Sequence, residues 1–106
     1  MYEDLLPIGS VVLLHGAKTK LMITGRILSD EKLEQIYDYV SVVYPVGNTG
    51  EENQYFFNRD AIERVVFIGL QDEDEINFKE QILSKLGELT IKDGQIVAKD
   101  EAEEEE

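Results

Sequence analysis

The chain has 106 residues, contains no cysteine and carries a formal net charge of −13. This length predicts one domain, and the lack of cysteine excludes a disulfide framework and a thiolate metal site. The charge is uneven, because residues 1–50 hold four basic and six acidic side chains, whereas residues 51–106 hold six and seventeen. Such a surface repels nucleic acid and anionic lipid, so we expect neither as a partner and favour a basic protein surface instead.

The N-terminal residues M-Y-E-D-L-L-P-I-G are acidic and lack the basic region that begins a signal peptide. No apolar run approaches the roughly 20 residues that a membrane-spanning helix needs. These two observations predict a cytoplasmic protein that does not insert into a membrane.

The first two predicted strands lie near the N-terminus. Val11–Leu14 is an unbroken apolar run, too short for a helix and rich in the β-branched residues that strands favour. A second strand is predicted at Leu21–Leu28, where Gly25 indicates a bulge or a sharp bend. Residues 29–35 form a polar connection in which one capped helical turn is expected.

Three further strands follow in the aromatic part of the chain. We predict a strand at Ile36–Tyr44, a long mobile loop at 46–54, a short strand at Tyr55–Phe57, a 3₁₀ turn within 58–63 and a strand at Val65–Leu70. This order is that of a small SH3-like antiparallel barrel, whose closure would remove exposed strand edges. The alternative is an α+β sheet with a helix across one open face.

The segment after the fifth strand combines a hinge and a helix. Residues 71–75 are acidic and are interpreted as a solvated hinge. Asn77 and Glu80 have the spacing of a capping box, which predicts that a helix of about nine residues begins there. Its apolar side chains recur every four residues and form one narrow stripe: Phe78, Ile82 and Leu86.

The C-terminal part ends in a predicted hairpin and an acidic tail. Thr90–Val97 has two short β-prone runs around an Asp-Gly pair, which is a strong hairpin signal. Residues 100–106 are almost entirely acidic and are predicted to be disordered. We therefore divide the chain into a small β domain over residues 1–75, a helix and hairpin over 76–99, and a tail over 100–106.

No residue in the sequence is a strong candidate for catalysis or metal binding. His15 is the single histidine and has no partner ligands at zinc-site spacing. The acidic run Asp72–Glu75 lacks the glycine and the twelve-residue spacing of a calcium loop, and no serine has a base nearby in the sequence. We predict no catalytic residue, no cofactor site and no metal site, so the protein is not expected to be an enzyme. Asp38, between two tyrosines of a strand, is interpreted as a structural hydrogen-bonding group rather than a recognition group.

The aromatic residues suggest a partner-binding surface. Tyrosine combines apolar area with a polar tip, which suits interfaces, and a nine-residue helix needs a docking surface. The hypothesis is that one surface combines three tyrosines, the loop that begins at Gly47 and Asn48, and the helix stripe: Tyr37, Tyr39, Tyr44, Gly47, Asn48, Phe78, Ile82 and Leu86. The competing interpretation is that the helix packs on its own sheet and that the tyrosines belong to the core.

Four segments together resemble a known family. They read L-L-P-I-G-S-V-V-L-L from Leu5, K-L-M-I-T-G-R from Lys20, Y-D-Y-V-S-V-V-Y-P-V-G-N from Tyr37, and F-F-N-R-D-A-I-E-R-V-V-F-I-G-L from Phe56. Over about residues 5–75 the chain resembles a small domain of unknown function that occurs in Gram-positive bacteria beside type VII secretion genes and LXG-type polymorphic toxins.

This resemblance implies a cytoplasmic accessory protein, an adaptor or chaperone for a secreted toxin or its helical export domain. Two other functions remain open, namely an immunity protein that neutralises a toxin domain and a structural subunit of the secretion apparatus. A homodimer also remains open. No catalytic residues come with the resemblance.

Overall fold

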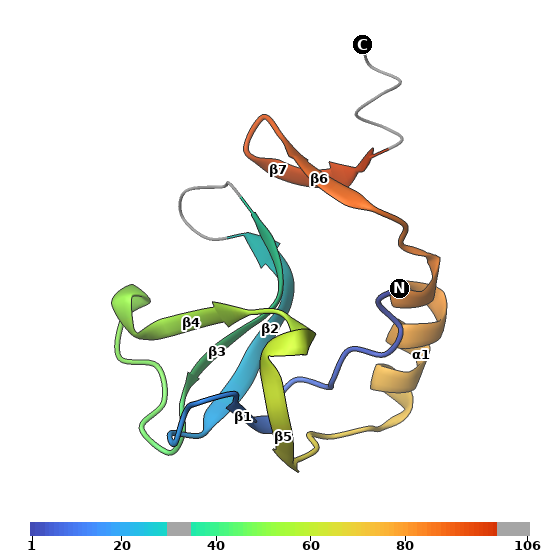
Figure 1. The fold of residues 1–106 in the computed structure, drawn as a ribbon. Coiled ribbons are helices and arrows are strands. Elements are labelled where there is room, and N and C mark those ends of the chain that lie inside the picture. The colour runs from blue at the N-terminus through green and yellow to red at the C-terminus, as the bar shows by residue number, and fades with distance from the viewer. Residues whose placement is uncertain (30–34, 100–106) are drawn as a thin grey trace.

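The computed structural model describes residues 1–29 and 35–99. The expected helical turn within 29–35 and the acidic tail at 100–106 therefore lie largely or wholly outside the described residues. Figure 1 shows the elements in chain order: β1 (Val11–Leu14), β2 (Leu21–Ser29), β3 (Ile36–Val43), η1 (Glu51–Asn53), β4 (Gln54–Phe57), η2 (Arg59–Ala61), β5 (Ile62–Phe67), α1 (Glu73–Gln81), η3 (Leu83–Lys85), β6 (Leu89–Lys92) and β7 (Gln95–Ala98).

Five strands form one antiparallel sheet in the order β4-β3-β2-β1-β5, and β6 pairs with β7 in a separate hairpin. The mainly-β prediction with one short helix is thus confirmed. The sheet is strongly twisted but open, because β4 and β5 are its two edges and do not pair with each other. The expected barrel closure is wrong, and the edge of β5 that closure would have covered is exposed.

A bulge bends β2 where the sequence contains Gly25. The register of β2 against β3 shifts between Ile23 and Gly25. A Cβ atom at Gly25 would lie 2.7 Å from Cγ1 of Val40, so a side chain would not fit without movement of that valine. The predicted irregularity at this glycine is confirmed, and its cause is the close approach of β3.

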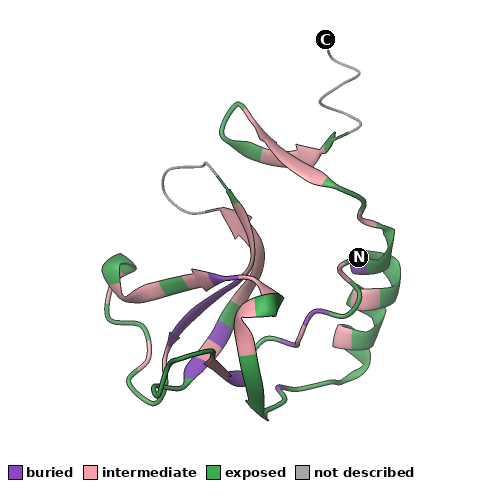
Figure 2. Ribbon diagram, viewed as in Figure 1, coloured by how far each residue is buried: buried purple, intermediate pink, exposed green. Residues whose placement is uncertain are grey.

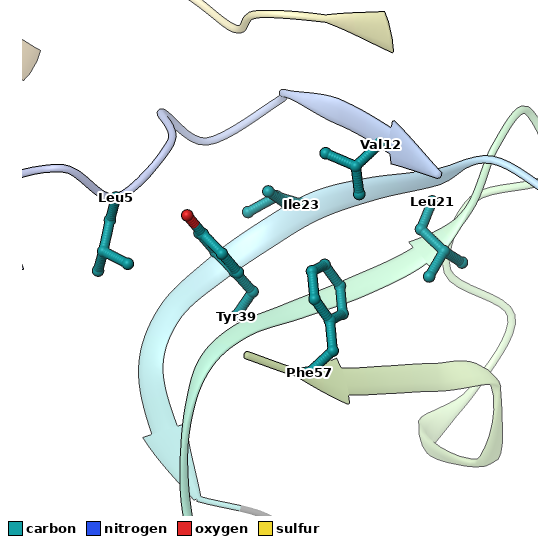
Figure 3. Packing of buried hydrophobic residues seen from close by; sticks show 6 residues of the cluster. All are labelled: Leu5, Val12, Leu21, Ile23, Tyr39 and Phe57. Carbon is teal, nitrogen blue, oxygen red and sulfur yellow. The ribbon is translucent and has the colours of Figure 1, made fainter. Parts of the chain in front are cut away.

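The core lies between β1, β2, β3 and the N-terminal segment. Figure 3 shows its six buried side chains: Leu5, Val12, Leu21, Ile23, Tyr39 and Phe57. The rings of Tyr39 and Phe57, which are opposite each other on β3 and β4, lie 5.3 Å apart between centroids. Burying each of these large side chains contributes about 1.5–3 kcal/mol, so these side chains account for much of the sheet's stability.

A buried crossing joins the N-terminal segment to the chain that leaves β5. The Ser10 hydroxyl donates to the Pro7 carbonyl at 2.8 Å and accepts the Gly69 N–H at 2.9 Å. A Cβ at Gly69 would lie 2.2 Å from the carbonyl oxygen of Ile8. The two backbones can approach this closely only because residue 69 is glycine.

Several element boundaries differ from the predictions. β3 ends at Val43, and β5 runs from Ile62 to Phe67 rather than from 65 to 70. The 3₁₀ turn within 58–63 is confirmed as η2. The interpretation of residues 71–75 as a hinge is wrong. Asp72 caps α1 by accepting the Glu75 N–H at 3.1 Å, and the acidic residues after Asp72 form the first helical turn. Carboxylates at a helix N-terminus are favoured by the helix dipole.

The C-terminal hairpin is confirmed. Asp93 and Gly94 have φ angles of 52° and 77°, as the two central residues of a type I′ turn require. The hairpin stands beyond the end of α1 and beside the N-terminal end of β3 (Figure 1). Of the helices in the described part of the chain, none is long and apolar enough to cross a membrane.

Candidate partner-binding site

An apolar cavity of about 600 Å³ lies between α1, β2 and the β6–β7 hairpin. Phe78, Ile82 and Leu86 line it, so the three residues of the predicted stripe do meet at one place. They do not lie on one continuous helix, because α1 ends at Gln81 and the 3₁₀ turn η3 follows. The other walls include Ile27 of β2 and Ile96 of β7. A cavity of this size and composition is typical of a binding site for an apolar group.

The apolar side chains of this wall are only partly covered by the protein itself. Phe78 and Ile82 are 41% and 48% exposed, whereas Leu83 beside them is buried at 2%. Leu83 therefore secures η3 to the fold, and its two neighbours present apolar area to the cavity. The competing interpretation, in which the helix packs on its own sheet, therefore holds in part, because Leu83 is buried whereas Phe78 and Ile82 keep nearly half of their surface exposed.

A buried ion pair holds α1 against β2. Nη1 and Nη2 of Arg26 each donate to one oxygen of the Glu75 carboxylate at 2.8 Å, and the two side chains are only 9% and 10% exposed. Arg26 also donates to the Leu6 carbonyl at 3.3 Å, and its guanidinium carbon lies 5.3 Å from the centre of the Phe78 ring. Bidentate geometry and stacking are the arrangements in which arginine binds most specifically. This pair fixes the orientation of the cavity wall.

Ile27 gives the cavity an unusual backbone feature. Its φ angle is 57°, in the left-handed region that β-branched residues rarely adopt. It lies within β2 between two paired positions, Arg26 opposite Tyr39 and Leu28 opposite Tyr37. Strained residues of this kind cluster at functional sites, where the surrounding structure holds them in place.

The tyrosines of the hypothesis do not join this site. Tyr39 is 1% exposed and its hydroxyl accepts the Leu6 N–H at 2.9 Å, so its expected place on a binding surface is wrong. Tyr37 packs against Phe56 with 5.6 Å between ring centroids. Tyr44 is 46% exposed and lines a different cavity, beside β5. Burial of Tyr39 was hard to foresee, because alternation along a strand does not say which face is inside.

The Gly47 and Asn48 loop has a local structural role and is absent from the cavity lining. The Gly47 N–H donates to the Val43 carbonyl at 2.8 Å, and Gly47 has a φ angle of 86° that suits glycine. The Asn48 side chain accepts the Gly50 N–H at 3.1 Å. The structure therefore brings together only the helix-stripe part of the predicted surface.

Asp38 has the structural role that was favoured from the sequence. Its carboxylate accepts from the backbone N–H of Arg59 at 2.9 Å and from Nε of Arg59 at 3.0 Å. Donating to the Asp38 carboxylate raises the pKa of Arg59 above its ordinary value, and Arg59 also donates to Asp4 and to the Met1 carbonyl. Its guanidinium lies 5.9 Å from the Tyr2 ring, and burial raises the pKa of that tyrosine. This cluster ties the first residues of the chain to β3.

Sequence reasoning missed the residues contributed by β2 and by the hairpin. Ile27 and Ile96 were interpreted only as strand residues, and Arg26 was not singled out. A lone arginine in an apolar strand was the one available signal, because such a charge needs a buried partner. Among the described residues, no three histidine, aspartate or glutamate side chains are arranged to hold a metal ion.

The fold and the cavity define a small open-sheet domain with a short helix joined to it by the Arg26–Glu75 ion pair. Residues 5–78 match the model of a family described as a domain of unknown function, DUF4176, and the chain belongs to this family. The match includes the sheet, Arg26, Glu75 and Phe78, and ends before Ile82 and the hairpin. No curated protein and no solved structure matches the chain.

Proposed function

We propose that this protein is a non-catalytic adaptor or chaperone that binds an amphipathic helix of another protein in the α1 cavity. The observation that carries the proposal is the half-exposed pair Phe78 and Ile82 on the wall of an apolar cavity of about 600 Å³. Helix-in-groove recognition uses apolar anchors spaced three or four residues apart on the bound helix. A cavity between a helix and a strand offers such anchors an apolar pocket while the rest of the bound helix stays at the rim.

The charge distribution supports a basic partner. Residues 51–106, which supply most of the cavity wall, carry six basic and seventeen acidic side chains. A negative field of this size steers a basic helix toward the site and mainly raises the association rate. The partner helix in this proposal has one apolar face and lysine or arginine on its flanks.

The resemblance to domains encoded beside type VII secretion genes supports a narrower form of the proposal. In that form the partner is an LXG-type toxin, its long helical export domain occupies the cavity, and the complex assembles in the cytoplasm. We further infer an SH3-like fold that is open between β4 and β5. The strand order β4-β3-β2-β1-β5 and the 3₁₀ turn before β5 support this inference.

A binding and toxicity experiment tests the proposal. The protein is co-purified with the separate export domain and toxin domain of an LXG toxin, and the affinity for each is measured by calorimetry. Ile82→Ala should weaken export-domain binding by about 1–3 kcal/mol and leave the melting temperature unchanged. Val46→Ala is the matched control, because Val46 is 66% exposed and lies outside the cavity.

Each alternative function has its own readout in the same experiment. Binding to the toxin domain together with rescue of cells that express that domain alone would identify an immunity protein. Fractionation with membranes in the presence of the secretion apparatus would identify a structural subunit. Equal binding by the Ile82 and Val46 variants would refute the cavity as the binding site.

A further inference from the structure

The outer edge of β5 is an open strand edge. β5 pairs with β1 on one side, and no described strand pairs with it on the other. An unpaired edge presents backbone N–H and C=O groups that can pair with another strand, and proteins usually protect such edges with lysine, proline or a covering element. β5 contains neither lysine nor proline, and its charged residues Glu63 and Arg64 lie in its first half. The edge from Val65 onward is therefore competent to accept a further strand.

The side chains along this edge are apolar and exposed on both faces. Exposure is 41% or more at each of five positions: Val65, Val66, Phe67, Ile68 and Leu70. Figure 2 shows β5 as exposed along most of its length, in contrast to β3 in the middle of the sheet. Because successive residues of a strand point to opposite faces, neither face of β5 is covered. A continuous apolar patch of this kind marks an interaction surface.

A second cavity, of about 330 Å³, lies beside β5 on its paired side, where β1 and β2 contribute Val11 and Met22 to the lining. Val66 and Phe67 of β5 line it together with Met22 of β2 and with Tyr44, which follows β3. Lys20 stands over the Tyr44 ring at 5.7 Å on the same lining. In strand addition the backbone hydrogen bonds supply affinity, and pockets that take alternate side chains supply specificity. The open edge provides the backbone groups, and the exposed Phe67 at the border of the cavity provides an apolar side-chain contact.

The charge next to the edge indicates what the occupant is. β5 ends at Phe67, and the exposed residues Asp72, Glu73 and Asp74 follow at the start of α1, beyond a short connecting segment. A second copy of this chain would bring together two molecules that each carry a net charge of −13. Long-range repulsion opposes that association, whereas a basic segment is attracted.

We propose that β5 binds an extended segment of a basic partner protein as an added antiparallel strand. Its backbone pairs with the outer edge of β5, and one large apolar side chain packs against Phe67, which is 61% exposed and borders the 330 Å³ cavity. An antiparallel strand begins where β5 ends, so lysine or arginine residues at its N-terminal end lie toward the segment that leads to Asp72–Asp74 of α1. Antiparallel pairing matches the rest of the sheet. This surface shares no residue with the lining of the α1 cavity, so it goes beyond the proposed function.

Fluorescence anisotropy with synthetic peptides tests this proposal on the full chain. The probe is a labelled peptide of alternating valine and threonine that contains one phenylalanine and begins with a run of lysines. A control peptide has the lysines replaced by glutamates, and a second control has a proline in the middle. The lysine probe should bind roughly tenfold or more tightly than either control, because the first control loses charge attraction and the second loses backbone pairing.

Glutamate substitutions separate the edge from simple charge attraction. Phe67→Glu should weaken binding of the lysine probe roughly tenfold or more, although the added negative charge by itself would strengthen binding. Val46→Glu is the matched control, because Val46 is 66% exposed and lines neither cavity, and it should not weaken binding. Ile68→Glu is a second edge variant in case Phe67→Glu does not fold, and Ile82→Ala should bind this probe normally.

Three results would overturn the proposal. The first is equal binding of the probe to the edge variants and the Val46 variant. The second is equal binding of the lysine, glutamate and proline peptides. The third is a concentration-dependent dimer, seen by analytical ultracentrifugation, that the edge variants abolish, because the occupant of β5 would then be a second copy.

Discussion

The ion pair between Arg26 and Glu75 provides the sharpest test of how α1 is held to the sheet. Glu75→Gln keeps the shape of the side chain and removes the charge that faces a guanidinium only 9% exposed. Breaking a buried pair costs about 3–5 kcal/mol. In this variant Arg26 keeps its hydrogen bond to the Leu6 carbonyl at 3.3 Å and its contact with the Phe78 ring, whose centre is 5.3 Å away. We therefore expect a loss of stability at the lower end of this range, about 3 kcal/mol.

A loss of this size is easily measured in a chain of this length. It corresponds to a fall in melting temperature of roughly 10–20 °C by calorimetry. Hydrogen exchange should show faster exchange in α1 and η3, while β2 and β3 keep their protection, because the pair joins the helix to an otherwise independent core. Glu80→Gln is the matched control on the exposed side of the same helix and should change stability by less than about 0.5 kcal/mol. Similar melting temperatures for the Glu75 and Glu80 variants would refute the reasoning.

Three further predictions follow from the core and the charge. Gly69→Ala should lower the free energy of unfolding, measured by urea titration, by about 1–3 kcal/mol, because the added Cβ would lie 2.2 Å from the Ile8 carbonyl oxygen. Gly87→Ala is the control and should leave the free energy of unfolding unchanged, because a Cβ at Gly87 would have no atom within 4 Å. Burial raises the pKa of Tyr39 above 10.0, so the folded state binds its proton more tightly and stability should fall as the pH rises from 10 through the folded pKa. Tyr39→Phe should reduce that alkaline loss and cost about 1–3 kcal/mol at pH 7, because the Leu6 N–H loses its acceptor, and an unchanged pH profile would contradict this assignment. Added salt should slow association with a basic partner much more than it speeds dissociation, which stopped-flow measurements at several salt concentrations can check.

Local patterns along the chain were sufficient for most of the secondary structure. β1 follows from four consecutive apolar residues, the bulge in β2 from Gly25, and the C-terminal hairpin from Asp93-Gly94. Each of these signals acts within a few residues, through side-chain branching or backbone dihedral preference. The structural role of Asp38 was also foreseeable, because a carboxylate in an apolar strand needs hydrogen-bond donors nearby.

The start of α1 shows where local signals competed. Asn77 with Glu80 has capping-box spacing, but Asp72 caps the helix and Glu75 is drawn into its first turn. Asp72 and Glu75 have the same capping spacing as Asn77 and Glu80, so two local patterns indicated different helix starts. The pair between Glu75 and Arg26, which are 49 positions apart, favours the earlier start and is not reported by any short-range pattern.

The sequence by itself determined that this is a small, acidic, mainly-β domain with one short helix, because composition and period-two patterning depend only on neighbouring residues. Only the tertiary structure decided which face of β3 is buried, and it placed Tyr39 in the core and not on a surface. It also decided that the sheet stays open at β5 and that the Phe78–Ile82 wall meets the hairpin across a cavity. These outcomes depend on how twisted strands and a helix far apart in the chain fit together, and that fit is a property of the whole fold.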